Sequence, residues 1–115
     1  MRFLSMVKAR EGGQPPTQQA MDDMEKLIGE AFKAGWLLSA EGLLPSKLGF
    51  RVRSTSGKLT VTDGPFTEAK EVVGGISIFT AASKEEAIAL TKKFMAGSEQ
   101  DTECEVRQLY DMPAA

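Results

Sequence analysis

The sequence predicts a single α+β domain. Two segments with a strand, helix, strand pattern flank a central stretch of alternating residues that is typical of a β-hairpin. The chain has 115 residues, within the commonest domain length of roughly 100–150 residues. Its 42% hydrophobic and 26% charged residues exclude disordered, collagen-like and coiled-coil chains. We therefore expect one domain over residues 1–115.

The first unit begins with a strand over residues 2–9, whose apolar residues fall on both faces, as in a strand covered on both sides. After a break rich in glycine and proline, Thr17 is placed to cap a helix. The apolar positions of this helix recur every three or four residues. Gly35 is suited to end it, because glycine readily takes the left-handed conformation of a C-terminal cap. A second strand is expected over residues 36–40.

The alternating residues 50–62 predict the hairpin, with residues 55–57 (Thr-Ser-Gly) as its turn. The face expected to be apolar carries Phe50, Val52, Leu59 and Val61.

The second unit begins with a strand over residues 72–80. The helix that follows opens at Ser83, which has the spacing to Glu86 of a capping box, where each side chain accepts a hydrogen bond from the other residue's backbone N–H. Gly97 is expected to end this helix, and a last strand covers residues 104–110.

Two split β-α-β units predict an antiparallel sheet with both helices on one face, a ferredoxin-like arrangement with the hairpin inserted between the halves. The strands at residues 3–7 and 72–79 carry apolar residues on both faces. A monomer would thus expose a larger apolar patch than soluble monomers tolerate. We therefore predict a two-fold homodimer through the sheet face that the helices leave open.

Several classes of chemistry are excluded by composition. The chain has no histidine, which removes histidine-based acid–base catalysis, Ser-His-Asp triads and imidazole metal sites. Its single cysteine, Cys104, lies in an expected strand between Glu103 and Glu105, which would raise the pKa of its thiol. We interpret Cys104 as a buried structural residue and expect no metal site and no cofactor.

Charge and hydropathy restrict the partners. A net charge of −2 and a pI of about 5.2 argue against a nucleic-acid-binding surface. No apolar run approaches the ~18 residues that span a bilayer, and basic residues interrupt the N-terminus where a secretion signal would need an apolar stretch. Low cysteine content fits a reducing compartment, so we expect a cytoplasmic protein without membrane or nucleic-acid partners.

The segment from Asp63 to Glu71 is the strongest site candidate. Asp63, Gly64 and Pro65 have the composition of a tight turn, and the charged residues after them fit a solvated face. Alternatively, Asp63, Glu68, Lys70 and Glu71 line the rim of a cleft, where a lysine among carboxylates can hold an anionic group.

Two further positions have open interpretations. Arg51 and Arg53 share the polar face of the hairpin, where they are either solvated or a pair that binds a carboxylate or phosphate. Glu41 follows an apolar strand and is exposed, paired with an arginine, or a carboxylate whose pKa is tuned by burial.

The segment Asp63-Gly64-Pro65-Phe66 resembles the DGPF signature of the YCII-related proteins, and Glu68, the Lys70-Glu71 pair and Gly74-Gly75 follow it as in that family. The resemblance covers essentially the whole chain and implies a ferredoxin-like fold of the dimeric α/β-barrel type. It also implies a possible association with an extracytoplasmic-function sigma factor. The YciI-type members carry a His–Asp pair proposed as catalytic, which this histidine-free chain cannot have.

We therefore expect a small dimeric protein that binds a small molecule in a cleft beside the DGPF segment, as a binding or regulatory module. The alternatives are a cofactor-free enzyme of proton-transfer type, such as an isomerase or a monooxygenase-like protein, and an interaction domain linked to a sigma factor. The first alternative rests on fold-level analogy. A carboxylate buried in the cleft favours the enzyme, and exposed carboxylates favour the module.

Overall fold

The computed structural model describes residues 1–12, 15–66, 71–98 and 101–111. The main sheet contains β1 (Arg2–Ala9), β2 (Leu37–Gly42), β5 (Val72–Thr80) and β6 (Glu103–Gln108). The helices are α1 (Gln18–Ala34) and α2 (Lys84–Met95), and a single 3-10 turn, η1 (Ser46–Leu48), leads into the hairpin of β3 (Phe50–Thr55) and β4 (Lys58–Asp63). No helix among the described residues is long and apolar enough to cross a membrane.

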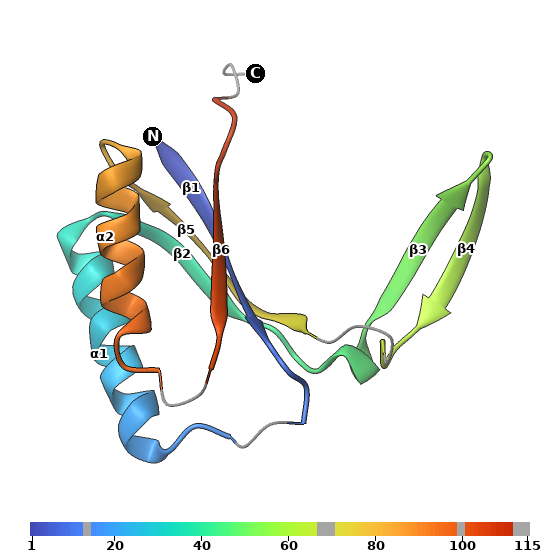
Figure 1. The fold of residues 1–115 in the computed structure, drawn as a ribbon, viewed down its shortest axis with the longest axis horizontal. Helices are drawn as coiled ribbons and strands as arrows, with labels where there is room; N and C mark the ends of the chain where they lie inside the picture. Colours follow the sequence, from blue (N-terminus) through green and yellow to red (C-terminus); the bar gives the residue numbers. More distant parts are fainter. Residues whose placement is uncertain (13–14, 67–70, 99–100, 112–115) are drawn as a thin grey trace.

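The main sheet has the strand order β2-β5-β1-β6, and every neighbouring pair is antiparallel. Strand β5 therefore separates β1 from β2, and β1 separates β5 from β6, so both β-α-β units are split. Figure 1 shows both helices on one side of this sheet. The predicted α+β class with an antiparallel sheet is confirmed, and the arrangement is compatible with a ferredoxin-like fold.

Alternation along β1 divides the sheet into two faces. Phe3 and Ser5 are buried toward the helices, whereas Leu4 and Met6 point to the other face and are half-buried. On β5, Phe79 pairs with Phe3 and completes the buried side, where the core is small. The core residues, all at most 5% exposed, are Phe3, Ala31, Leu37, Phe79, Ala81 and Ala87.

The face without helices, which we call the open face, has an apolar centre. Leu4 pairs with Ile78 and Met6 pairs with Ile76, so the four side chains lie together. Charged residues paired with this centre lie on the outer strands, namely Glu41 on β2 and Glu105 and Arg107 on β6.

The predicted helix starts and the stop at Gly35 are confirmed, whereas α2 ends at Met95 with Ala96 as its C-cap and not at Gly97. The Thr17 hydroxyl accepts a hydrogen bond from the Ala20 N–H at 3.2 Å, and Gly35 takes the left-handed conformation with φ of 87°. At α2, the Ser83 hydroxyl accepts from the Glu86 N–H at 3.1 Å, which is the half of the capping box that satisfies a helical N–H.

The predicted hairpin is also confirmed, and it forms a sheet of its own. Its turn residues Ser56 and Gly57 both have positive φ. In Figure 1 the hairpin stands away from the main sheet, on the side opposite the helices. This shape raises the radius of gyration to 16.3 Å, compared with about 13 Å for a compact chain of this length.

Candidate functional site

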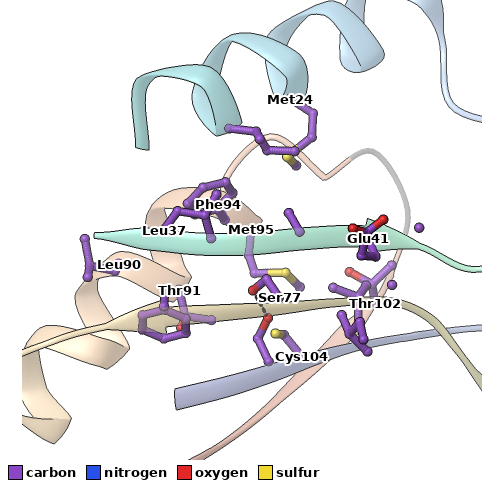
Figure 2. A pocket seen from close by; sticks show the side chains of 18 of the residues that line it. Met24, Leu37, Glu41, Ser77, Leu90, Thr91, Phe94, Met95, Thr102 and Cys104 are labelled. Carbon is purple, nitrogen blue, oxygen red and sulfur yellow. Dashed lines mark hydrogen bonds between the residues drawn. The ribbon is translucent and has the colours of Figure 1, made fainter. Parts of the chain in front are cut away.

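A cavity of about 390 Å³ lies between the helix-covered face of the sheet and the two helices. It follows β2 from Leu37 at one end to Glu41 at the other (Figure 2). Large apolar side chains form its helical wall because both helices turn their apolar stripes to the sheet. These wall residues are Met24, Ile28, Leu90, Phe94 and Met95.

The strand floor of the cavity carries a small polar spot. The hydroxyl oxygens of Ser5 on β1 and Ser77 on β5 are 2.5 Å apart, so one hydroxyl donates to the other. Figure 2 shows this bond as a dashed line at Ser77, with the Cys104 sulfur beside it. The two serines are a register pair in the antiparallel ladder, which brings their side chains together on one face.

Burial raises the pKa of the Cys104 thiol, and hydrogen bonds with Ser5 and the Met6 backbone oppose the rise only in part. The pKa of the Cys104 thiol is therefore raised, as the sequence predicts, but the cause is burial and not the acidic neighbours. The positive charge of Lys8 offsets the negative charges of these two glutamates. Its Nζ atom lies 2.8 Å from the Glu105 carboxylate and 3.6 Å from the Glu103 carboxylate. Since a thiol of raised pKa is a poor nucleophile, Cys104 fits a structural role.

The predicted cleft beside the DGPF segment is not where this cavity lies. Glu41, whose cross-strand pair with Ile76 belongs to the open face, lies on the edge strand β2 and borders one end of the cavity, where it is exposed. No described residue from 43 to 73 lines the cavity. The carboxylate Glu71 is exposed just before β5. Glu68 and Lys70 lie outside the described residues, so their predicted roles stay predictions.

The structure separates the three candidates on the hairpin. Asp63 pairs with Phe50 and shares the apolar face, whereas Arg51 and Arg53 lie on the opposite face. Asp63 thus does not face the arginines. The Arg51 guanidinium carbon lies 3.8 Å from the centre of the Phe66 ring, a cation–π contact between β3 and the DGPF segment. All three residues are exposed, and their role in binding a ligand stays a prediction.

The described DGPF residues close the base of the hairpin against the segment that precedes β3. The Gly64 N–H donates to the Gly49 carbonyl at 2.9 Å, and a Cβ atom on Gly64 would lie 1.8 Å from the Ser46 carbonyl oxygen. Only glycine permits this approach. The Phe66 N–H in turn donates to the Ser46 hydroxyl at 3.3 Å.

Glu11 attaches this base to the loop after β1. Its carboxylate accepts hydrogen bonds from both the N–H and the hydroxyl of Ser46. These bonds, the one from the hydroxyl first, lower the pKa of the Glu11 carboxyl. Ser46 therefore joins three loops that are distant in sequence, and we call this group of Glu11, Ser46, Gly64 and Phe66 the Ser46 tether.

Sequence reasoning missed the cavity serines and the Ser46 tether. A usable signal existed for the serines, because Ser5 and Ser77 each interrupt an apolar run, at residues 3–7 and 76–79. No local pattern links Glu11 to Ser46, which is 35 residues away.

The comparisons with known proteins confirm the resemblance to the YCII-related proteins. The chain is 28% identical over 92 residues to the uncharacterized protein R00369 of Rhizobium meliloti (strain 1021), a match that covers 80% of this chain and 74% of that protein. The model of the YCII-related domain matches residues 1–112. Because this match spans nearly the whole chain, the protein belongs to the YCII-related family.

Proposed function

We propose that this protein is a binding or regulatory module that holds a small, largely apolar molecule in the cavity between the sheet and its helices. The cavity itself carries the proposal, because about 390 Å³ of space walled by apolar side chains is within the size and chemistry of small-molecule sites. This site replaces the cleft beside the DGPF segment as the place where we expect the ligand.

The serine pair narrows the chemistry of the ligand. One hydroxyl proton of the pair is used between Ser5 and Ser77, and Ser5 also hydrogen-bonds with the Cys104 thiol, which leaves the Ser77 hydroxyl to hydrogen-bond with a bound molecule. A ligand with one polar group, such as an ester, ketone or alcohol, on a hydrocarbon body would satisfy this spot and still bury its apolar surface.

The exposure of the carboxylates favours a binding module over a proton-transfer enzyme. Among the described residues that line the cavity, Glu41 is the only carboxylate, and it is exposed. Asp63 and Glu71 are exposed as well. An acid–base catalyst working near neutral pH would be served better by a carboxylate desolvated beside the ligand.

The open face supports a two-fold dimer of the α/β-barrel type as part of the same proposal. No helix of the described residues lies over its apolar centre of Leu4, Met6, Ile76 and Ile78, and Ile76 is 36% exposed. Packing two such faces together would bury this centre, with the charged outer strands as a rim.

Trp36 gives a direct test of the cavity, because it is the only tryptophan of the chain and lines the cavity wall. We expect methyl octanoate, an ester on a hydrocarbon chain, to cause a saturable change in Trp36 fluorescence. The variant Cys104→Leu fills part of the cavity and should weaken this binding by about 10-fold or more.

The matched control is Gln108→Leu, on the same face of the same strand but exposed and outside the cavity. It should bind methyl octanoate as the unaltered protein does. A fluorescence change that does not saturate, or equal affinity in both variants, would contradict binding in this cavity.

A further inference from the structure

The β3–β4 hairpin lacks the support that hairpins normally need. Its two strands pair only with each other, and all twelve strand residues are exposed. An isolated two-stranded hairpin is marginally stable in water, and packing against another surface is required for it to persist. The described part of the chain provides no such surface along the strands.

One face of this hairpin is chemically suited to a protein contact. The cross-strand register places its apolar residues together, opposite a face with Arg51, Arg53, Thr60 and Thr62. The apolar residues are all more than half exposed, namely Phe50 at 65%, Val52 at 54%, Leu59 at 68% and Val61 at 67%. Contiguous apolar surface of this kind marks an interaction site.

The base of the hairpin is held firmly, which fixes its direction. The bonds from Ser46 to Glu11 join it to the loop after β1, and the contacts of Gly64 with Gly49 and of Arg51 with Phe66 close its base. A binding element that is oriented in advance loses less conformational entropy on association than a free one. The hairpin is therefore oriented in advance as an arm that can contact a partner.

Position and area indicate a second copy of this chain as the occupant. The hairpin lies on the same side of the sheet as the open face, so a molecule packed on that face comes within reach of it (Figure 1). The chain exposes 8903 Å² in total, about 2,800 Å² more than the scaling law gives for a compact monomer of this mass. An obligate homodimer buries about 1,000–2,500 Å² on each protomer, which this excess can supply.

We propose that the hairpin is a dimer arm, which packs the apolar face of Phe50, Val52, Leu59 and Val61 on the second copy bound to the open face. This inference rests on the proposed dimer through the open face, and it adds the hairpin as a second contact region of that dimer. By two-fold symmetry each copy contributes one arm, so the contact forms twice.

The test compares two triple variants by sedimentation over a dilution series of about three decades. Val52→Thr, Leu59→Thr and Val61→Thr together make the apolar face polar but keep β-branched residues, which suit a strand. Arg53→Thr, Thr60→Ser and Thr62→Ser change the opposite face as the control. We expect the first variant to raise the dimer Kd by about 100-fold or more and the control to leave it nearly unchanged.

A photo-crosslink covers the case in which the first variant loses its hairpin structure. The reactive residue p-benzoylphenylalanine at Leu59, in an otherwise unaltered chain, should join two chains into a species of twice the 12.4 kDa mass, and at Thr60 it should not. An unchanged dimer Kd in the apolar-face variant, or no crosslink from Leu59 in a dimer, overturns the arm and leaves the open-face dimer standing. An unaltered protein that stays monomeric overturns both, while methyl octanoate binding still reports on the cavity.

Discussion

The covered side of the sheet and the hairpin use the same strand pattern with opposite results. Phe79 and Phe50 both lie on the apolar face of a strand, yet Phe79 is 3% exposed and Phe50 is 65% exposed. Helices from the same chain cover Phe79, and no described residue covers Phe50. The comparison teaches that alternation determines which residues share a face, whereas burial depends on what packs over that face.

The largest expected difference is between Phe79→Ala and Phe50→Ala. Phe79 stacks on Phe3 with ring centres 5.6 Å apart, so its removal should lower the free energy of unfolding by about 3–5 kcal/mol. Phe50→Ala should cost within about 0.5 kcal/mol for the single chain. Urea unfolding followed by circular dichroism measures both.

Protein concentration sharpens this first comparison. Any larger loss of stability in Phe50→Ala should depend on protein concentration, because it can arise only through association. A large loss that is independent of concentration would show that Phe50 is covered within its own chain.

The next effect concerns the attachment of the hairpin. Gly64→Ala should lower stability at the hairpin base by about 3 kcal/mol, because its Cβ atom would overlap the Ser46 carbonyl oxygen. Gly29→Ala is the control, since nothing lies within 4 Å of that Cβ position and alanine should stabilise the α1 interior by about 1 kcal/mol. Hydrogen exchange of the backbone N–H at position 64, which donates to the Gly49 carbonyl, measures the loss of stability at the hairpin base. Unchanged exchange in Gly64→Ala would mean that the two loops do not approach so closely.

A smaller effect belongs to the covered side. Ser83→Ala removes the acceptor of the Glu86 N–H and should lower the free energy of unfolding by about 1 kcal/mol. Ser83→Thr keeps the hydroxyl and should retain most of the stability. The urea midpoint measures both, and equal midpoints for Ser83→Ala and the unaltered protein would contradict the cap.

The smallest effect is the pH response of the Ser46 tether. The pKa of the Glu11 carboxyl is lowered in the folded chain, so the folded state binds its proton less readily than the unfolded state. The stabilising contribution is therefore present above the ordinary glutamate pKa of 4.5 and is lost as the pH falls through the lower folded value. The Ser46 amide shift in NMR should titrate with a midpoint below 4.5, and Glu11→Gln should abolish that titration. A midpoint at or above 4.5 would contradict the contact.

Much of the fold could be predicted because its signals are local. Strand alternation, the caps at Thr17 and Ser83 and the stop at Gly35 each depend on residues a few positions apart, and the structure confirms them. The candidate site was less accessible to sequence reasoning. Of the five predicted residues that the structure describes, only Glu41 lines the cavity, because charged residues near a turn are a weak indicator of where empty space lies.

The sequence by itself determined the order of the elements, the two faces of each strand and the family to which the chain belongs. Only the tertiary structure decided that the helices leave a cavity over Ser5 and Ser77, and that Gly64 meets Ser46. The physical reason is the sequence distance over which each interaction acts. Backbone periodicity and caps act within a few residues, whereas a cavity or a close approach depends on how distant segments pack, which no short stretch of sequence encodes.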